Sequence, residues 1–172
     1  MFFLVVGRSV MSSSAITIRQ KLGRVLSPFY LTYCQLSRGM TLGVRAAVID
    51  GQGRVFLVKH TYVPGWHLPG GGVEVHQSAE EALARELDEE GHIRLDQPGE
   101  LRGLYYNKEA SRRDHVAFFV VRHFTQQRPR RPDREIAEAS FFAANALPAG
   151  TSQGTRRRLD ELAGRRVPDG LW

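Results

Sequence analysis

The stretch GGVEVHQSAEEALARELDEEGHI, from Gly71 to Ile93, carries the strongest local structural signal in the chain. Within it, Ser78 and Glu81 form an S-x-x-E pattern, in which each side chain bonds the backbone amide of the other residue at the start of a helix. The residues that follow are strong helix formers. The stretch therefore predicts a helix from Ser78 to Glu90.

Three glutamates share one face of this predicted helix. Glu86, Glu89 and Glu90 stand at positions i, i+3 and i+4, which places them within about 100° of one another around the helix axis. Like charges at this spacing repel one another, and a hard divalent cation with oxygen ligands would neutralise them. Leu83 and Leu87 flank the glutamates and are expected to anchor the helix to a core. The alternative interpretation is an acidic helix face that is only solvated.

A glycine-rich loop, Pro69-Gly70-Gly71-Gly72, precedes the helix. Because glycine lacks a Cβ atom, such a loop lets the backbone approach a ligand closely. Its carbonyl groups suit a cation, and its amides suit a phosphate. A glycine run alone is more often only a turn, but here five residues separate it from a capped helix with three carboxylates. The ordered combination is far more specific than either part.

The charges of the chain are unevenly distributed. Its 172 residues include 24 Lys or Arg and 18 Asp or Glu, for a net charge of +6. From Glu74 to Glu100 there are nine acids and two arginines, a local charge of −7, so the rest of the chain carries +13. A carboxylate cluster in a cationic surround is what a metal-assisted enzyme acting on phosphates would use.

Length and composition restrict the class of protein. A chain of this length with 42% hydrophobic residues suits one globular domain with a modest extension, and it is too apolar for wholesale disorder. Cys34 is the only cysteine, so an internal disulfide is impossible and a reducing, cytoplasmic location is expected. No apolar run reaches the roughly 18–20 residues that span a bilayer. The oligomeric state is left open.

The hydrophobic pattern predicts the remaining elements. Strands are expected over residues 42–50, 54–59, 101–107, 115–124 and 137–142, and a last helix over 155–163. The strand over 115–124 is nearly all apolar and is expected to be central. Residues 1–40 are expected to hold two short amphipathic helices after a tail or start-site artefact of about 14 residues. Strands interleaved with helices around one core indicate an α/β or α+β layered domain.

Residues 71–93 resemble the Nudix box, G-x5-E-x7-R-E-U-x-E-E-x-G-U, where U is an aliphatic residue. The positions that match in register are Gly71, Arg85, Glu86, Leu87, Glu89, Glu90 and Ile93. The approach to the box, WHLPGGG over residues 66–72, is similar to the W-x-L-P-G-G-G of the same family. The resemblance covers residues 41–148 and implies an α/β/α sandwich with a mixed central sheet. Residues 149–172 are expected to form a helix that packs on this domain.

The resemblance also implies an activity. Nudix enzymes hydrolyse the pyrophosphate bond of a nucleoside diphosphate linked to another moiety, such as an NTP, a dNTP or a nucleotide sugar, by water attack on phosphorus. Carried over by residue, the family's Mg²⁺ site, which Mn²⁺ can also fill, consists of Glu86, Glu89, Glu90 and the carbonyl of Gly70. Arg85 belongs to the same catalytic group. The number of metals and the particular nucleotide are left open.

A further glutamate follows from the same resemblance. Family members often take one, as ligand or general base, from a loop before the last core strand. Glu135 fits that position, and Glu138 is the alternative. The arginines that precede Glu135, in the loop over residues 128–134, either contact phosphates or form a solvated basic loop.

Two positions depart from the family pattern. Gln77 replaces a glutamate that by resemblance is a partner of Arg85, and a glutamine can accept a guanidinium hydrogen bond only without charge assistance. His92 replaces the last glycine and is expected to change how the helix ends. These departures leave an alternative function, a Nudix-fold nucleotide-binding or regulatory module with weakened catalysis. A third hypothesis, binding of nucleic acid or an anionic membrane by the basic N-terminal region, is the weakest, and a small nucleotide is the expected partner.

Overall fold

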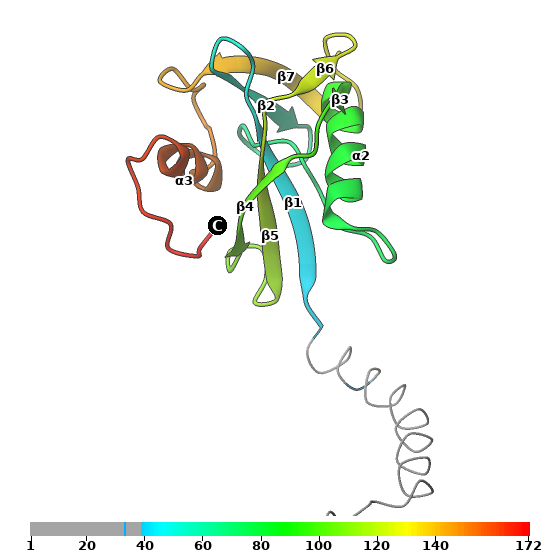
Figure 1. The fold of residues 1–172 in the computed structure, drawn as a ribbon, viewed down its shortest axis with the longest axis vertical. Coiled ribbons are helices and arrows are strands. Elements are labelled where there is room, and N and C mark those ends of the chain that lie inside the picture. Colours follow the sequence, from blue (N-terminus) through cyan, green and yellow to red (C-terminus); the bar gives the residue numbers. More distant parts are fainter. Residues whose placement is uncertain (1–32, 34–38) are drawn as a thin grey trace, which may run out of the picture. The chain divides into compact units, whose positions relative to one another are not determined.

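The computed structural model describes Tyr33 and residues 39–172 (Figure 1). The two amphipathic helices expected before Gly39, the tail over residues 1–14 and Cys34 lie outside the described residues. Residues 40–172 form one structural unit, and the fold and the candidate site belong to it.

Strands form three small sheets at the centre of this unit. A mixed sheet has the order β1-β5-β4, with β1 (Thr41–Val48) parallel to β5 (Asp114–Val121), and β4 (Glu100–Tyr106) antiparallel to β5. In the other two sheets, β2 (Arg54–His60) pairs antiparallel with β7 (Ile136–Ala143), and β3 (Ile93–Leu95) pairs antiparallel with β6 (Phe124–Gln126). The apolar strand β5 is the middle strand of the mixed sheet, as its sequence predicted.

The sequence missed the break that follows β5. A single strand was expected to reach residue 124, but β5 ends at Val121 and a new strand, β6, begins at Phe124. Arg122 and His123 between them are exposed, which interrupts the buried run. The partner of β6, β3, was also missed, because a strand of three residues is too short to show a period of two.

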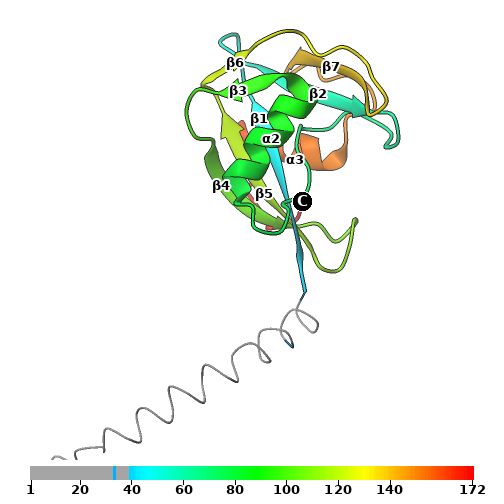
Figure 2. The same ribbon diagram turned by 90° about the vertical axis from the view of Figure 1, so that its right-hand side faces the viewer.

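Two helices cover opposite sides of the strands. In Figures 1 and 2, α2 (Ala79–Gly91) lies on one side of the sheets and α3 (Gln153–Leu162) on the other. Leu83 and Leu87 of α2 are fully buried in one hydrophobic cluster, and Leu159 of α3 belongs to a second. The predicted α/β/α layering is confirmed. Within the described part of the chain, no helix is both long and apolar enough to cross a bilayer.

The ends of α2 are set by local chemistry. Ser78 Oγ accepts a hydrogen bond from the amide of Glu81 at 3.2 Å, and Glu81 Oε2 accepts one from the amide of Ser78 at 2.8 Å, so the predicted capping box forms. The helix ends where His92 adopts a left-handed conformation with φ 51° and donates its amide to the carbonyl of Asp88. Glycine is the usual residue in this conformation, so His92 ends the helix at a conformational cost.

Candidate active site

The glycine-rich loop lies along strand β1. The amide of Val44 donates to the carbonyl of Gly71 at 2.8 Å, and the amide of Ala46 donates to that of Pro69 at 3.0 Å. Gly70 has φ 139°, and a Cβ atom on it would lie 2.1 Å from the carbonyl oxygen of Val44. Only glycine can therefore occupy this position, and the loop is held against the mixed sheet.

Glu90 is the most buried carboxylate of the predicted site. Its Oε2 accepts a hydrogen bond from the amide of Gly70 at 2.7 Å, and its Oε1 lies 3.3 Å from Nε2 of His60. The residue is only 5% exposed. Burial raises the pKa of Glu90 to about 7, although the charge of Arg45 and the Gly70 hydrogen bond oppose the shift.

Glu86 lies directly against the glycine loop. A Cβ atom on Gly71 would come within 2.2 Å of Glu86 Oε1, so the carboxylate occupies the space that a side chain would fill. Burial raises the pKa of Glu86, although Arg85 Nη1 lies 2.9 Å from the same oxygen. The glycine loop and α2 thus meet at two neighbouring carboxylates, Glu86 and Glu90.

Arg85 links the helix to the loop. Its Nη1 lies 2.9 Å from Glu86 and 3.1 Å from Glu89, and its Nη2 donates to the carbonyl of Gly72 at 3.0 Å. Arg85 therefore contacts Glu86, Glu89 and Gly72, whereas Gln77 Oε1 accepts a hydrogen bond from the backbone amide of Glu74 at 3.1 Å. The glutamine stabilises its own loop, and it takes no part in orienting the arginine.

Glu89 is the exposed member of the three glutamates, with 59% of its side chain accessible. Among the described residues, no group of three or more His, Cys, Asp or Glu side chains converges on one point as metal ligands do. The donor chemistry nevertheless fits a hard cation. Burial raises the pKa values of both Glu86 and Glu90, which shows that these two carboxylates lack enough positive charge nearby to ionise freely.

Two residues of this site, Arg45 and His60, were not predicted from the sequence. Arg45 Nη1 donates to the carbonyl of Leu68 at 3.0 Å, and its charge acts on both Glu86 and Glu90. Burial, reinforced by Arg45, lowers the pKa of His60 to about 4, so the imidazole beside Glu90 is neutral at pH 7. A charged residue inside the apolar run of β1 was the one sequence signal that could have identified Arg45.

The two candidates for the further glutamate have different surroundings. The charge of Glu135 contributes to the raised pKa of Glu90, so Glu135 is within electrostatic reach of the site. Glu138 instead forms an ion pair with Lys59 at 2.7 Å on the exposed surface of the β2–β7 sheet.

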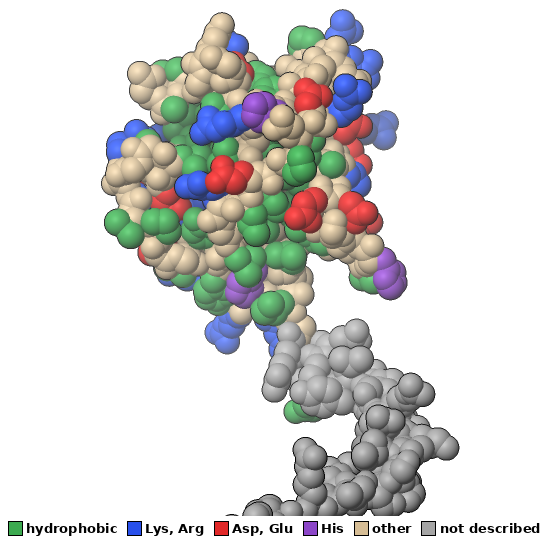
Figure 3. All heavy atoms as spheres, viewed as in Figure 1, with side chains coloured by type: hydrophobic (Ala, Val, Ile, Leu, Met, Phe, Trp, Pro, Cys, Tyr) green, Lys and Arg blue, Asp and Glu red, His purple; other side chains and the backbone are tan. Residues whose placement is uncertain are grey.

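A pocket of about 660 Å³ opens beside the carboxylates. Its lining includes His60 and Gly71, which contact Glu90 and Glu86, together with Arg45. Four large aromatic residues of the strands and the loop before the glycines belong to the core and not to this pocket, because they are buried: Trp66, Tyr105, Phe118 and Phe119. Figure 3 shows acidic side chains gathered on the side of the molecule that carries α2.

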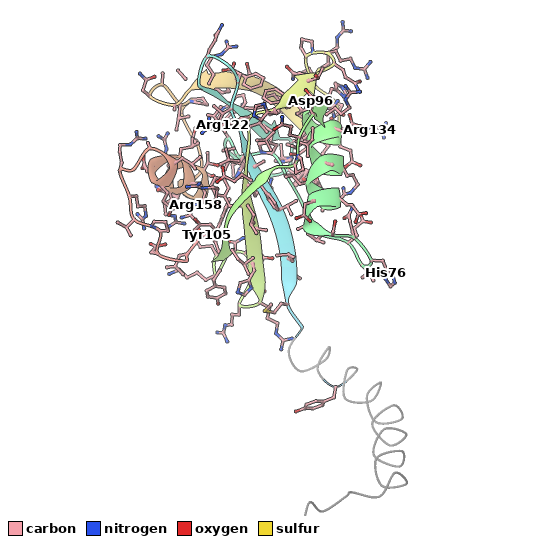
Figure 4. The ribbon with its side chains drawn as sticks, in the orientation of Figure 1. His76, Asp96, Tyr105, Arg122, Arg134 and Arg158 are labelled. Atoms are coloured by element: carbon pink, nitrogen blue, oxygen red, sulfur yellow. The ribbon has the colours of Figure 1, made fainter. Side chains whose placement is uncertain are left out.

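The arginine-rich loop over residues 128–134 does not line this pocket. Arg128, Arg130 and Arg131 line a second cavity of about 540 Å³ together with His92, and Arg130 pairs with Asp133. Figure 4 shows Arg134 on the same side of the molecule as α2. These arginines are not part of the pocket lining beside Glu86 and Glu90.

Comparison with known proteins identifies the family. The NUDIX domain model matches residues 39–162, and the chain belongs to the Nudix family of pyrophosphohydrolases. A Bacillus subtilis (strain 168) protein, named for a proposed 8-oxo-dGTP diphosphatase activity, is 35% identical over 122 residues, which cover 71% of this chain and 79% of that protein. The MutT NUDIX hydrolase from Burkholderia pseudomallei has a similar structure, with a TM-score of 0.62 and 26% identity, over 71% of this chain and 97% of that one.

A second relative is matched over a shorter length. The RNA pyrophosphohydrolase of Hydrogenovibrio crunogenus is 28% identical over 88 residues, and the match spans 51% of each chain. The chain therefore covers only about half of that protein.

Proposed function

We propose that the chain hydrolyses the pyrophosphate bond of a nucleoside triphosphate, or of a related nucleoside diphosphate derivative, in a reaction that requires a divalent cation. The observation that supports this most directly is the environment of Glu90. The Glu90 carboxylate, in a residue that is 5% exposed, accepts a hydrogen bond from the amide of Gly70 at 2.7 Å, beside a pocket of about 660 Å³. Pockets of this size suit a nucleotide-sized ligand.

Glu86, Glu89, Glu90 and the carbonyl of Gly70 would hold the cation, Mg²⁺ or Mn²⁺. When bound, the cation polarises the pyrophosphate and lowers the pKa of the attacking water. Arg85 keeps Glu86 and Glu89 together through its Nη1 contacts.

Two further residues act on the substrate side of the proposed reaction. Arg45 lines the pocket and supplies positive charge for the phosphates. Glu135 lies within electrostatic reach of Glu90 and is the proposed acceptor of the proton from the attacking water.

Nucleoside triphosphates are the first substrate class to test. The Bacillus subtilis relative is named for action on 8-oxo-dGTP, and it is the more similar of the two named relatives over the longer length. We place 8-oxo-dGTP and the common NTPs and dNTPs first in the proposed substrate range, ahead of nucleotide sugars. A nucleotide substrate also agrees with the cytoplasmic location predicted from the sequence.

The test is a nucleotide panel with the full chain. Purified protein is incubated with Mg²⁺ or Mn²⁺ and with NTPs, dNTPs, 8-oxo-dGTP and nucleotide sugars, and the release of phosphate and pyrophosphate is measured. We expect cation-dependent release that the Glu90→Gln variant loses and that the Asp88→Asn variant, altered on the exposed face of the same helix, retains. If the parent chain released no more phosphate or pyrophosphate than the Glu90→Gln variant, the proposal would be overturned. Nucleotide binding without release would then support the binding or regulatory module.

A further inference from the structure

Residues 164–172, the return segment, follow α3 and return to the edge of the mixed sheet. Leu171 forms a parallel bridge with Tyr106 of β4. The amide of Tyr106 donates to the carbonyl of Gly170 at 2.8 Å, and the amide of Trp172 donates to the carbonyl of Tyr106 at 3.0 Å. Backbone hydrogen bonds to a sheet edge hold this segment, so the position of Trp172 is set by the fold.

The indole of Trp172 is packed against aromatic rings, helix α3 and the guanidinium of Arg158, which lies 5.4 Å from its ring centroid. Its ring centroid lies 6.1 Å from that of Tyr105 and 6.1 Å from that of Phe118, with edge-to-face geometry in both cases. Against α3, it occupies the space beside Gly154, where a Cβ atom would lie 2.5 Å from the indole Nε1. The guanidinium of Arg157 also contacts the backbone oxygen of Trp172.

Trp172 is half-buried because it also lines the pocket of about 660 Å³. Two large aromatic residues line this pocket, Trp172 and Tyr62. Tyr62 lies at the carboxylate end, because its ring centroid is 5.2 Å from that of His60, whose Nε2 lies 3.3 Å from Oε1 of Glu90. Trp172 is therefore the large aromatic surface of the pocket that is not beside the carboxylates.

The rest of the lining divides in a way that matches a nucleotide. Gly71, Gly72 and Arg45 offer backbone amides and positive charge, which suit phosphates. Asn107 and Asp114 offer polar groups, and they are held in place by a 2.8 Å hydrogen bond from Asn107 Nδ2 to Asp114 Oδ2. A nucleobase needs an apolar face to pack against and polar groups at its edge.

We propose that Trp172 is a specificity residue, and that the nucleobase of the substrate packs against its indole in the pocket closed by the return segment. This inference rests on the proposed function, because it concerns the same pocket. It adds that a residue 79 positions beyond the last residue of the Nudix box sets the affinity for the nucleoside half of the substrate.

Steady-state kinetics with the preferred nucleotide test the inference. We expect Trp172→Ala to raise KM about tenfold with little change in kcat, because the lost contact is with the base and not with the reacting phosphate. Gly154→Ala should raise KM as well, since its new Cβ displaces the indole without removing it. Trp172→Phe should fall between these variants and the parent chain.

The matched control is Val167→Ala, which changes an 83% exposed residue of the same segment and should leave KM unchanged. The purine-to-pyrimidine ratio of kcat/KM should fall in Trp172→Ala, since the larger base loses the larger stacking area. If Trp172→Ala does not fold, Trp172→Phe and Gly154→Ala decide the question. Folded variants at both positions with the KM of the parent chain would overturn the inference.

Binding measurements separate this inference from the proposed function. Calorimetric titration with nucleoside monophosphates in EDTA measures the pocket without turnover. If the parent chain hydrolyses nothing but binds a monophosphate that Trp172→Ala no longer binds, the inference stands and the proposed function fails. If the parent chain hydrolyses nucleotides and Trp172→Ala matches it in Kd and KM, the proposed function stands and the inference fails. A parent chain that neither binds nor hydrolyses would overturn both.

Discussion

The backbone amide of Gly70 donates a 2.7 Å hydrogen bond to Oε2 of Glu90, a residue 20 positions further along the chain. This contact joins the glycine loop on β1 to the fourth turn of α2, and it does so inside the protein, where Glu90 is 5% exposed. A charge at such a depth is costly unless it is compensated. The compensation that the described residues provide is incomplete, since the pKa of Glu90 is raised to about 7.

Replacing Glu90 with glutamine should abolish most of the activity and leave the fold intact. The amide keeps the shape of the side chain and an oxygen that can accept the Gly70 hydrogen bond, but it removes the charge that a divalent cation requires. We expect kcat/KM to fall about 100-fold or more. The measurement is nucleotide hydrolysis, with the melting temperature as a check on folding. Activity close to that of Asp88→Asn would contradict the role of Glu90.

In the absence of divalent cations, Glu90 should make stability depend on pH. Its pKa is raised from 4.5 in an exposed glutamate to about 7 in the folded state, so the folded protein binds this proton more tightly than the unfolded chain does. The contribution of this Glu90 proton to the free energy of unfolding is therefore complete below about pH 4.5 and is lost as the pH rises through about 7.

Urea unfolding in EDTA measures this effect. The free energy of unfolding of the parent chain should fall, relative to that of Glu90→Gln, between about pH 5 and pH 8. The raised pKa of Glu86 acts in the same direction in both proteins. A difference that stays constant across this range would show that Glu90 does not titrate as the structure indicates.

Replacing His92 with glycine should stabilise the protein. His92 has φ 51°, a left-handed conformation that costs most residues with a Cβ atom about 1 kcal/mol. The helix-ending hydrogen bond from its amide to Asp88 is a backbone interaction and is retained. We expect the free energy of unfolding of His92→Gly to rise by about 0.5–1 kcal/mol. His92→Ala is the control, and equal stabilisation by alanine would exclude backbone strain as the cause.

A buried arginine holds α3 to strand β4. Arg158 is fully buried, its guanidinium lies 3.6 Å from the centroid of the Tyr105 ring, and its Nη2 lies 2.6 Å from Glu161 (Figure 4). Replacing Arg158 with methionine leaves the buried Glu161 carboxylate without a cationic partner, with the Tyr105 hydroxyl as its remaining side-chain donor. We expect a loss of about 3–5 kcal/mol in the free energy of unfolding.

The control for Arg158 is Arg165, which pairs with Asp160 at the surface. Arg165→Ala should cost less than about 1 kcal/mol. Adding Glu161→Gln to Arg158→Met should recover part of the stability, because it removes the unpaired charge. A double variant less stable than Arg158→Met alone would mean that the loss comes from packing and not from charge.

Glu135 and Glu138 form a matched pair for testing which glutamate outside α2 accepts the proton from the attacking water. Glu135→Gln should lower kcat by about 100-fold if Glu135 accepts a proton in the reaction. Glu138→Gln should leave kcat unchanged, because its carboxylate is paired with Lys59 on an exposed surface. The measurement is kcat at saturating nucleotide and cation. A reversed order of the two effects would move the proposed role to Glu138.

Local sequence signals predicted the part of the fold that local chemistry controls. The capping box at Ser78 and Glu81 and the helix formers after it specify α2 with no help from distant residues. Alternating and apolar runs likewise predicted β1, β2, β4, β5 and β7 to within a few residues. The short pair β3 and β6 was missed, because its pairing depends on contacts between segments about 30 residues apart.

The candidate site shows the same division. The spacing of Glu86, Glu89 and Glu90 identified the carboxylates, since a helix fixes which residues share a face. Spacing could not show that Glu90 is buried, that Gln77 bonds the amide of Glu74, or that Arg45 and His60 join the group. Those features depend on which strand and loop the helix packs against.

The sequence by itself determined the helix, its three carboxylates and the family to which the chain belongs, because these follow from short-range periodicity and spacing. Only the tertiary structure decided how strongly each carboxylate holds its proton and which surface closes the pocket. Burial and electrostatic interactions between segments distant in sequence control both properties. Glu90 and Trp172 illustrate this, since each meets its decisive partner through a backbone contact with another element, Gly70 in one case and Tyr106 in the other.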